Sequence, residues 1–136
     1  MKFVIPGEPT GKGRPRVVNI GGHARAFTPE KTASYENLIK LEFERQGGCH
    51  LGKSEIVMRI RAFYAIPKGD SRIKREAKLA GSVRPVKKPD CDNVIKIVAD
   101  ALNGLAYDDD CQIVAVSCEK WFGEEPRVEV EIGIAD

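Results

Sequence analysis

The fold-deciding stretch is residues 93–134, which read NVIKIVADALNGLAYDDDCQIVAVSCEKWFGEEPRVEVEIGI. Asn93–Leu102 carries apolar side chains at helical spacing (Val94, Ile95, Val98, Ala101 and Leu102), which predicts a helix with one buried face. Gln112–Phe122 and Arg127–Ile134 predict two strands joined by a glycine- and proline-containing turn. In the second strand valine and isoleucine alternate with charged residues, so we expect Val128, Val130, Ile132 and Ile134 to face inward.

The residues before this stretch add further helices and strands. Lys2–Ile5 and Glu55–Ile66 predict strands, whereas residues 6–22 are too rich in glycine and proline for a regular helix. Thr28-Pro29 predicts a helix start, with Thr28 as the N-cap, and Gly47-Gly48 predicts its end. Ser71 is expected to cap a short basic helix, Arg72–Ala80. We therefore expect one α+β domain, residues 1–136, with a mixed β-sheet covered by about three helices.

Composition indicates a globular protein that works inside a cell. The chain is 42% hydrophobic and 31% charged, and its apolar runs are far shorter than a membrane span. Its first residues are interrupted by Pro6 too soon for a signal peptide. Four cysteines and two histidines show no zinc-binding spacing, so reduced thiols in a cytoplasmic protein are expected. We expect no membrane partner.

Charge is distributed unevenly along the chain. Residues 1–89 carry a net charge of +11 and residues 90–136 a net charge of −9. One interpretation is a phosphate-binding surface beside a metal-binding one. The alternative is that the two parts neutralise each other in the folded protein.

Six aspartates lie between Lys88 and Ile113, namely Asp90, Asp92, Asp100, Asp108, Asp109 and Asp110. Clustered carboxylates repel one another unless they are solvated or hold a cation, and their oxygens are the ligands that Mg²⁺ prefers. If the chain is extended up to the helix, Asp90 and Asp92 point to the same side, and Lys96 follows Asp92 one helical turn later. The alternatives are an N-cap at Asp92, a simple Asp92–Lys96 ion pair and a solvated turn at residues 108–110.

Such a group of residues suits phosphodiester hydrolysis. That reaction needs a deprotonated water, neutralisation of the phosphoryl oxygens and help for the leaving alkoxide, all of which metal ions supply. A lysine can stabilise the developing negative charge or position the attacking water.

The segment Lys88–Gln112 matches the pattern K-P-D-x-D-N-x-x-K-x-x-x-D-A-L-N-G-x-x-Y-x-D-D-x-Q, which resembles the RusA-type Holliday junction resolvases. The runs G-R-P-R at residues 13–16 and T-P-x-x-T-x-x-Y-E at residues 28–36 are similar to the N-terminal signature of that family. The resemblance implies a homodimeric bacterial or prophage endodeoxyribonuclease that resolves four-way DNA junctions by paired nicks with Mg²⁺, or Mn²⁺ as a substitute. Two alternative functions stay open: a non-catalytic DNA-structure-binding protein, and a nuclease acting on flaps or forks.

The resemblance also ranks the aspartates. It implies that Asp90, Asp92 and Asp110 are the catalytic metal ligands and that Lys96 is the essential lysine, with Asp109 as the contender for the third ligand. Asp100 is then expected to orient Lys96 or to close the site, and Asp108 and Asp109 to shape the turn that delivers Asp110.

The basic residues of the first part gain a role from the same resemblance. They could bind DNA phosphates with little sequence preference, although each could equally be solvated surface. The candidates are Lys12, Arg14, Arg16, Arg72, Lys74, Arg75, Lys78, Arg84, Lys87 and Lys88.

Overall fold

The computed structural model describes residues 1–13, 16–27 and 29–136, apart from the side chains of residues 16, 18, 20 and 25–27. It contains six strands, three α-helices and a short 3₁₀ turn, η1. In chain order they are β1 (Lys2–Pro6), β2 (Arg16–Ile20), β3 (His23–Phe27), α1 (Glu30–Arg45), β4 (Ile56–Ala65), α2 (Arg72–Leu79), α3 (Cys91–Ala101), η1 (Asp110–Gln112), β5 (Ile113–Gly123) and β6 (Arg127–Ile134).

Four of the strands form one mixed sheet in the order β1-β6-β4-β5. The two long strands β4 and β5 are parallel, while β6 is antiparallel to both β4 and β1. Although β5 and β6 follow one another in the chain, β4 lies between them in the sheet. The parallel β4–β5 pair needs a crossover connection, and that connection contains α2 and α3. The predicted α+β fold with a mixed sheet and three helices is confirmed.

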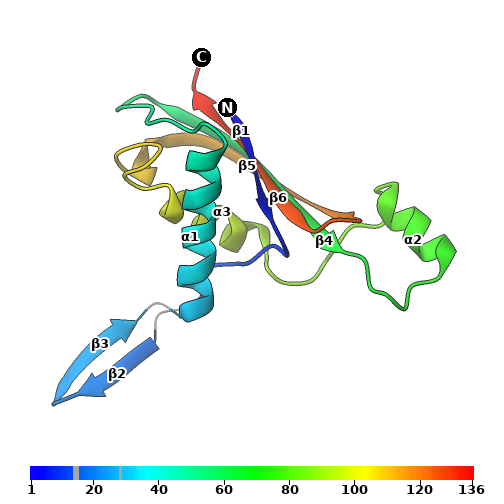
Figure 1. Ribbon diagram of the computed structural model, residues 1–136, viewed down its shortest axis with the longest axis horizontal. Helices are drawn as coiled ribbons and strands as arrows, with labels where there is room; N and C mark the ends of the chain where they lie inside the picture. The colour runs from blue at the N-terminus through cyan, green and yellow to red at the C-terminus, as the bar shows by residue number, and fades with distance from the viewer. Residues whose placement is uncertain (14–15, 28) are drawn as a thin grey trace.

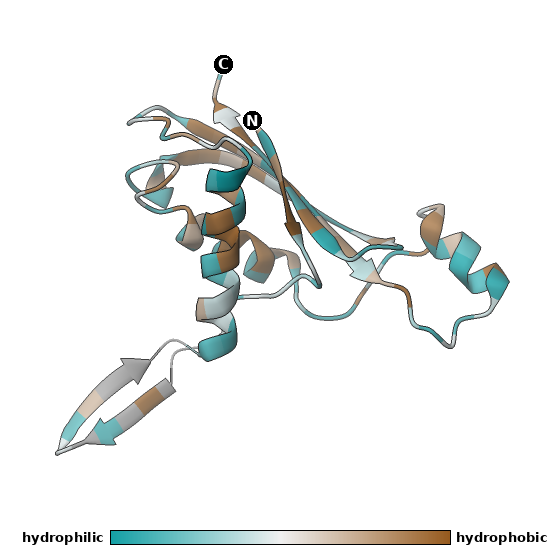
Figure 2. Cartoon of the chain, viewed as in Figure 1, coloured by the Kyte–Doolittle hydropathy of each residue, from teal (hydrophilic) through white to brown (hydrophobic). Residues whose placement is uncertain are grey.

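The hydrophobic core lies between the sheet and the helices α1 and α3, which cover one of its faces (Figure 1). Phe3 of β1 and Phe43 of α1 meet edge to face with ring centroids 5.4 Å apart, a favoured aromatic geometry. From α3, Ile97 and Val98 are completely buried. Figure 2 shows hydrophobic residues concentrated in the sheet and in α3, while α2 is mostly hydrophilic and has no buried residue.

A β-hairpin occupies residues 16–27, where the sequence excluded a regular helix up to residue 22 but predicted no strand. Strands β2 and β3 pair through Gly21-Gly22, whose φ angles of +58° and +82° are those of a tight hairpin turn. The hairpin extends away from the sheet, next to the start of α1 (Figure 1). The predicted N-cap, Thr28, lies outside the described residues, and Pro29 occupies the N-cap position of α1.

Two further expectations need correction. Ile134, predicted to face inward, is 53% exposed because it ends β6 beyond the core. Helix α3 begins at Cys91, two residues earlier than predicted, so Asp92 lies inside its first turn and Asp90 becomes the N-cap.

The predicted cap of the short basic helix is confirmed. Ser71 caps α2 through a hydrogen bond from the Lys74 amide, and the four cysteines are free thiols. Among the described residues, every helix is too short or too polar to cross a membrane.

Candidate active site

Asp90 stands at the N-terminal end of α3. Its backbone is extended, its carbonyl accepts the first helical hydrogen bond from Val94 at 3.1 Å, and its carboxylate caps no backbone amide. The buried Tyr64 fixes the residue before Asp90, because its hydroxyl donates a hydrogen bond to the Pro89 carbonyl at 2.6 Å. The Asp90 carboxylate is therefore exposed and available to an external ligand.

Asp92 and Lys96 lie on the exposed side of α3. Because Asp92 is helical, the expectation that Asp90 and Asp92 share one side of an extended chain is wrong, whereas the spacing of one helical turn from Asp92 to Lys96 holds. Among the described residues, the Lys96 ammonium pairs with Asp100 at 3.7 Å and makes no ion pair with Asp92. This contact agrees with the expectation that Asp100 orients Lys96.

The acidic turn between α3 and β5 is held by the other residues of the sequence motif. Asn103 accepts a hydrogen bond from the Asp110 amide through its side-chain oxygen at 2.8 Å. Gly104 has φ +76°, which favours glycine, and its amide donates to the Tyr107 carbonyl. The buried Tyr107 hydroxyl donates to the Ala99 carbonyl of α3 at 2.6 Å, so the turn is fixed against the helix.

Gln112 links this turn to the chain before β4. Its side-chain oxygen accepts hydrogen bonds from the Asp108 and Asp109 amides at 2.8 and 3.1 Å. Its side-chain nitrogen donates to the Gly52 and Ser54 carbonyls at 3.0 and 2.9 Å. Sequence reasoning used Gln112 only to set the register of the motif, so this structural role was missed.

Replacing Gln112 with alanine is expected to destabilise the protein by about 1–3 kcal/mol, because it removes four hydrogen bonds from a half-buried turn. Gln112→Glu keeps the acceptor but loses the donor and adds a fourth negative charge beside Asp108–Asp110. Denaturant unfolding measures both effects. An unfolding free energy of Gln112→Ala equal to that of the unmodified chain would contradict this role.

The carboxylates at this turn perturb one another. The neighbouring Asp109 carboxyl, then burial, then Asp100 raise the pKa of Asp110. The pKa of Asp109 is lowered by its side-chain hydrogen bond with Asp110 and by the Cys111 amide. Asp100, Asp109 and Asp110 therefore form one acidic group in which adding negative charge is unfavourable and a proton or cation is favoured.

Lys12 belongs to the same region through a contact that links three distant segments. Its ammonium lies 2.8 Å from Glu36 of α1 and 3.3 Å from Asp100 of α3. Burial opposes the charged form, but the hydrogen bonds to Glu36 and Asp100 outweigh it and raise the pKa of Lys12. Lys12 was predicted to contact DNA; that contact stays a prediction, and in the structure its charge is already partnered.

Two glycines let the segment around Lys12 approach the helices closely. A Cβ on Gly11 would lie 2.9 Å from the Pro89 side chain, and one on Gly13 would lie 2.6 Å from the Thr32 hydroxyl oxygen. The Gly13 amide instead donates to that Thr32 oxygen at 2.9 Å. The segment is thus pressed between the first turns of α1 and α3.

The donor chemistry fits a hard divalent cation, but one described chain does not assemble the predicted ligand set. Asp110 lies beside Asp100, near the end of α3, whereas Asp90 and Asp92 lie at its beginning. Asp92 and Asp100 are separated by about 12 Å along the axis at about 1.5 Å per residue. Within residues 1–13, 16–27 and 29–136, no three His, Cys, Asp or Glu side chains are close enough together to hold a metal ion.

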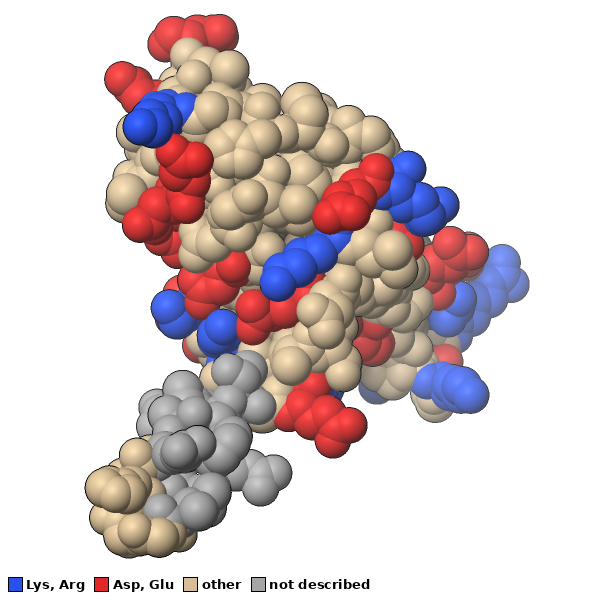
Figure 3. Space-filling model, turned by 60° about the vertical axis from the view of Figure 1, so that its left-hand side comes forward, with Lys and Arg blue, Asp and Glu red and all other residues tan. Residues whose placement is uncertain are grey.

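The basic candidates are partly neutralised. Arg72 pairs with Glu76 at 3.0 Å, Arg75 with Glu124 at 3.8 Å, and Lys78 with Asp70. Figure 3 shows Lys and Arg side chains directly beside Asp and Glu side chains on the face that it presents. The pairs Arg75–Glu124, Lys12–Asp100 and Arg61–Glu129 join residues 1–89 to residues 90–136, which supports the alternative that the basic and acidic parts of the chain neutralise each other in part. The pairs of Arg72 and Lys78 lie within the basic part itself.

The remaining basic candidates lie in different surroundings. Arg84 stacks on the Trp121 ring at 3.5 Å, Lys87 lies 5.9 Å from the Tyr64 ring centre, and Lys74 is exposed on α2. Lys88 lines a pocket together with Asp90. Arg14 and the side chain of Arg16 lie outside the described part of the chain.

Comparison with known proteins agrees with these features. The family model of the endodeoxyribonuclease RusA matches residues 6–133. The chain therefore belongs to the RusA endodeoxyribonuclease family.

A relative of similar length matches almost the whole chain. The chain is 36% identical over 134 residues to "Uncharacterized protein YqaN" of Bacillus subtilis (strain 168). The matched residues make up 97% of this chain and 94% of that relative.

Proposed function

We propose that the protein is a Mg²⁺-dependent endodeoxyribonuclease that resolves four-way DNA junctions by paired, symmetric nicks as a homodimer. The observation that carries the proposal is the way the family motif is used: Asn103, Gly104, Tyr107 and Gln112 all fix the turn that presents Asp110 beside Asp100. Four motif residues devoted to one exposed acidic turn are better explained by chemistry at that turn than by stability of the fold.

Asp90, Asp92 and Asp110 are the proposed ligands of Mg²⁺, for which Mn²⁺ can substitute. Because one described chain places Asp110 near the end of α3 and the other two at its beginning, they share one ion only if the acidic turn moves toward the start of α3 when the metal binds. A metal ion held by these residues would activate the attacking water and neutralise charge on the phosphoryl oxygens. Lys96, held by Asp100 at 3.7 Å, positions the water or stabilises the negative charge that develops on the phosphate. The water oxygen forms a bond to phosphorus, the bond from phosphorus to one sugar oxygen breaks, and a proton is transferred to the leaving alkoxide.

A two-fold dimer suits this substrate because resolution needs equivalent cuts in two strands, and a symmetric dimer presents two equivalent sites. Basic side chains outside the ion pairs, such as Lys74 and Lys88, contribute sequence-independent phosphate contacts.

The absence of a three-ligand group in the described residues favours one alternative, a DNA-structure-binding protein without nuclease activity. A nuclease that prefers flaps or forks is the other alternative.

One experiment separates the three functions. End-labelled four-way, flap and linear DNA are incubated with the protein in Mg²⁺ and, in parallel, in EDTA. Paired nicks confined to the four-way junction and lost in EDTA support the proposal. Binding of junctions without cutting in Mg²⁺ or Mn²⁺ supports the binding protein, and faster cutting of flaps supports the third function.

A further inference from the structure

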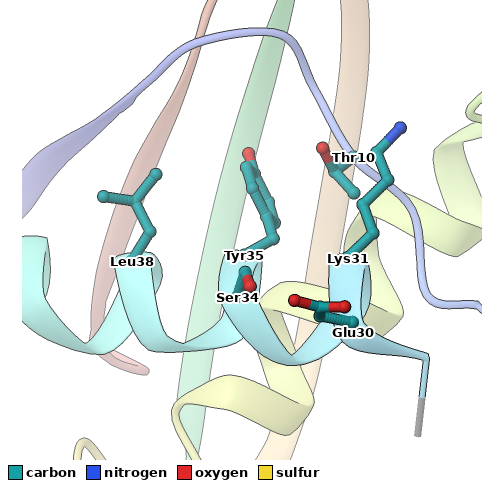
Figure 4. A pocket seen from close by; sticks show the side chains of 6 residues that line it. All are labelled: Thr10, Glu30, Lys31, Ser34, Tyr35 and Leu38. Carbon is teal, nitrogen blue, oxygen red and sulfur yellow. The ribbon is translucent and has the colours of Figure 1, made fainter.

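Two neighbouring pockets lie along α1 and share the lining residues Thr10 and Lys31. The first has a volume of about 530 Å³ and is lined by Thr10, Glu30, Lys31, Ser34, Tyr35 and Leu38 (Figure 4). The second, of about 420 Å³, shares Thr10 and Lys31 with the first and also contains Lys88, Asp90 and Asn93. Both volumes fall within the roughly 300–1,000 Å³ typical of ligand pockets. We call the combined depression the α1 groove; it runs from Asp90 to Leu38.

The floor of the α1 groove is well defined. It is formed by the segment Thr10–Gly13, which the close approaches of Gly11 to Pro89 and of Gly13 to Thr32 hold between the two helices. The Lys12 amide also donates to the Asn93 carbonyl at 3.4 Å. The groove therefore connects directly with the start of α3, where Asp90 is exposed.

The groups along the α1 groove suit an anion with several oxygen atoms. Lys31 and Lys88 are exposed, and Ser34 adds a hydroxyl donor, whereas the Thr10 hydroxyl already donates to the Glu8 carbonyl at 3.3 Å. Among the described residues no side chain caps the start of α1, so the first amides of this 16-residue helix add partial positive charge. Glu30 is the opposing group, because its carboxylate lines the same pocket.

Tyr35 is an independent sign of an incomplete polar site. The residue is 7% exposed, and its hydroxyl points from α1 toward the chain at Thr10 (Figure 4) but makes no hydrogen bond within the described residues. Burial, opposed by the nearby Thr10 backbone, raises the pKa of Tyr35, so the hydroxyl stays a neutral donor. A buried donor of this kind is costly unless a partner is supplied.

We propose that the α1 groove binds the DNA strand next to the scissile phosphate, with Lys31 contacting a neighbouring backbone phosphodiester. The inference rests on the proposed function, because it takes Asp90 as part of the cutting site. The proposal rests on Lys31, which lines both pockets, because a strand that leaves Asp90 along the groove passes this side chain. Lys31 is a binding residue in this proposal and takes no part in bond cleavage.

The test is junction binding by Lys31→Gln, measured in EDTA over a series of salt concentrations. Loss of one phosphate contact is expected to weaken binding and to reduce the slope of log affinity against log salt by about 0.9. Glu30→Gln is expected to change affinity in the opposite direction because it removes the opposing charge.

The matched controls are Lys40→Gln and Glu44→Gln, which make the same charge changes on exposed positions of α1 outside both pockets. The inference is supported if Lys31→Gln lowers the slope and Lys40→Gln does not. It is overturned if both lysine variants change affinity and slope equally while the unmodified protein binds and nicks junctions. Failure of the unmodified protein to bind or cut any branched DNA would instead remove the proposed function and this inference with it.

Discussion

Replacing Asp110 with asparagine is expected to slow nicking of four-way junctions by about a thousandfold or more while leaving junction binding largely intact. Asparagine keeps the size of the side chain and the backbone hydrogen bond to Asn103, but it removes the charge that a cation would neutralise. Asp110 is half-buried, as Asp100 is, and both Asp109 and Asp100 raise its pKa. Single-turnover nicking and junction binding, measured separately, give the two results. The same substitution at Asp90 or Asp92 should have the same effect.

Asp108→Asn is the matched control for Asp110→Asn. Asp108 lies in the same turn and is exposed. Among the described residues its one ion-pair partner is the His50 imidazole at 3.2 Å, so its charge can be removed without changing the contacts of Asp100 or Lys96. Nicking at nearly the full rate is expected for Asp108→Asn. Equal loss in both variants would indicate a general effect of charge, and a full rate for Asp110→Asn would remove this residue from the site.

Thermal unfolding tests the metal site without relying on activity. The pKa of Asp110 is raised in the folded protein, so this group favours folding when protonated, and that contribution is lost as pH rises through the folded pKa. At neutral pH, Asp110→Asn should therefore unfold at the same temperature as the unmodified protein or higher when no metal is present. Adding Mg²⁺ should stabilise the unmodified protein more than the variant.

The sequence predicts the elements whose signal is local. In β6, alternation identified the strand and its buried residues Val128 and Val130, but it could not show that the core ends before Ile134. The hairpin of β2 and β3 was missed because glycine and proline on either side suggested an irregular segment. Gly21-Gly22 followed by His23 was the available signal, since two glycines are typical of a tight hairpin turn.

The candidate site also combines features with a local sequence signal and features that depend on long-range packing. Asp90, Asp92, Lys96 and Asp110 were selected from a continuous motif, and the structure shows how Asn103 and Gln112 support the last of them. The ion pairs of Lys12 with Glu36 and Asp100 could not be predicted, because they depend on how three segments far apart in the chain pack together. The distance between Asp92 and Asp110 also depends on where α3 begins and how far it extends, and the motif alone does not give these boundaries.

Replacing Lys96 with methionine is expected to slow nicking by about a hundredfold or more, with a smaller effect on junction binding. The Lys96 side chain is 62% exposed, so methionine should leave the fold intact. Its ammonium lies 3.7 Å from Asp100, which Lys12 also contacts, so its position is defined by a fixed partner. Lys96→Arg keeps the positive charge, so it should recover part of the rate if Lys96 stabilises charge on the phosphate. If Lys96 instead positions the attacking water through the geometry of its ammonium group, Lys96→Arg should stay slow.

Lys40→Met provides the control, because it removes one exposed lysine from a helix at a position remote from α3 in sequence and outside the α1 groove. Nicking is measured with the junction fully bound, so that weaker affinity cannot account for a slower rate. Asp100→Asn then shows how Lys96 is held: loss of its partner should slow nicking less than loss of Lys96 itself, because the ammonium remains present but less well positioned. If Lys96→Met nicks bound junctions as fast as Lys40→Met, Lys96 has no part in the reaction, and the Lys96–Asp100 pair is only a surface ion pair on α3.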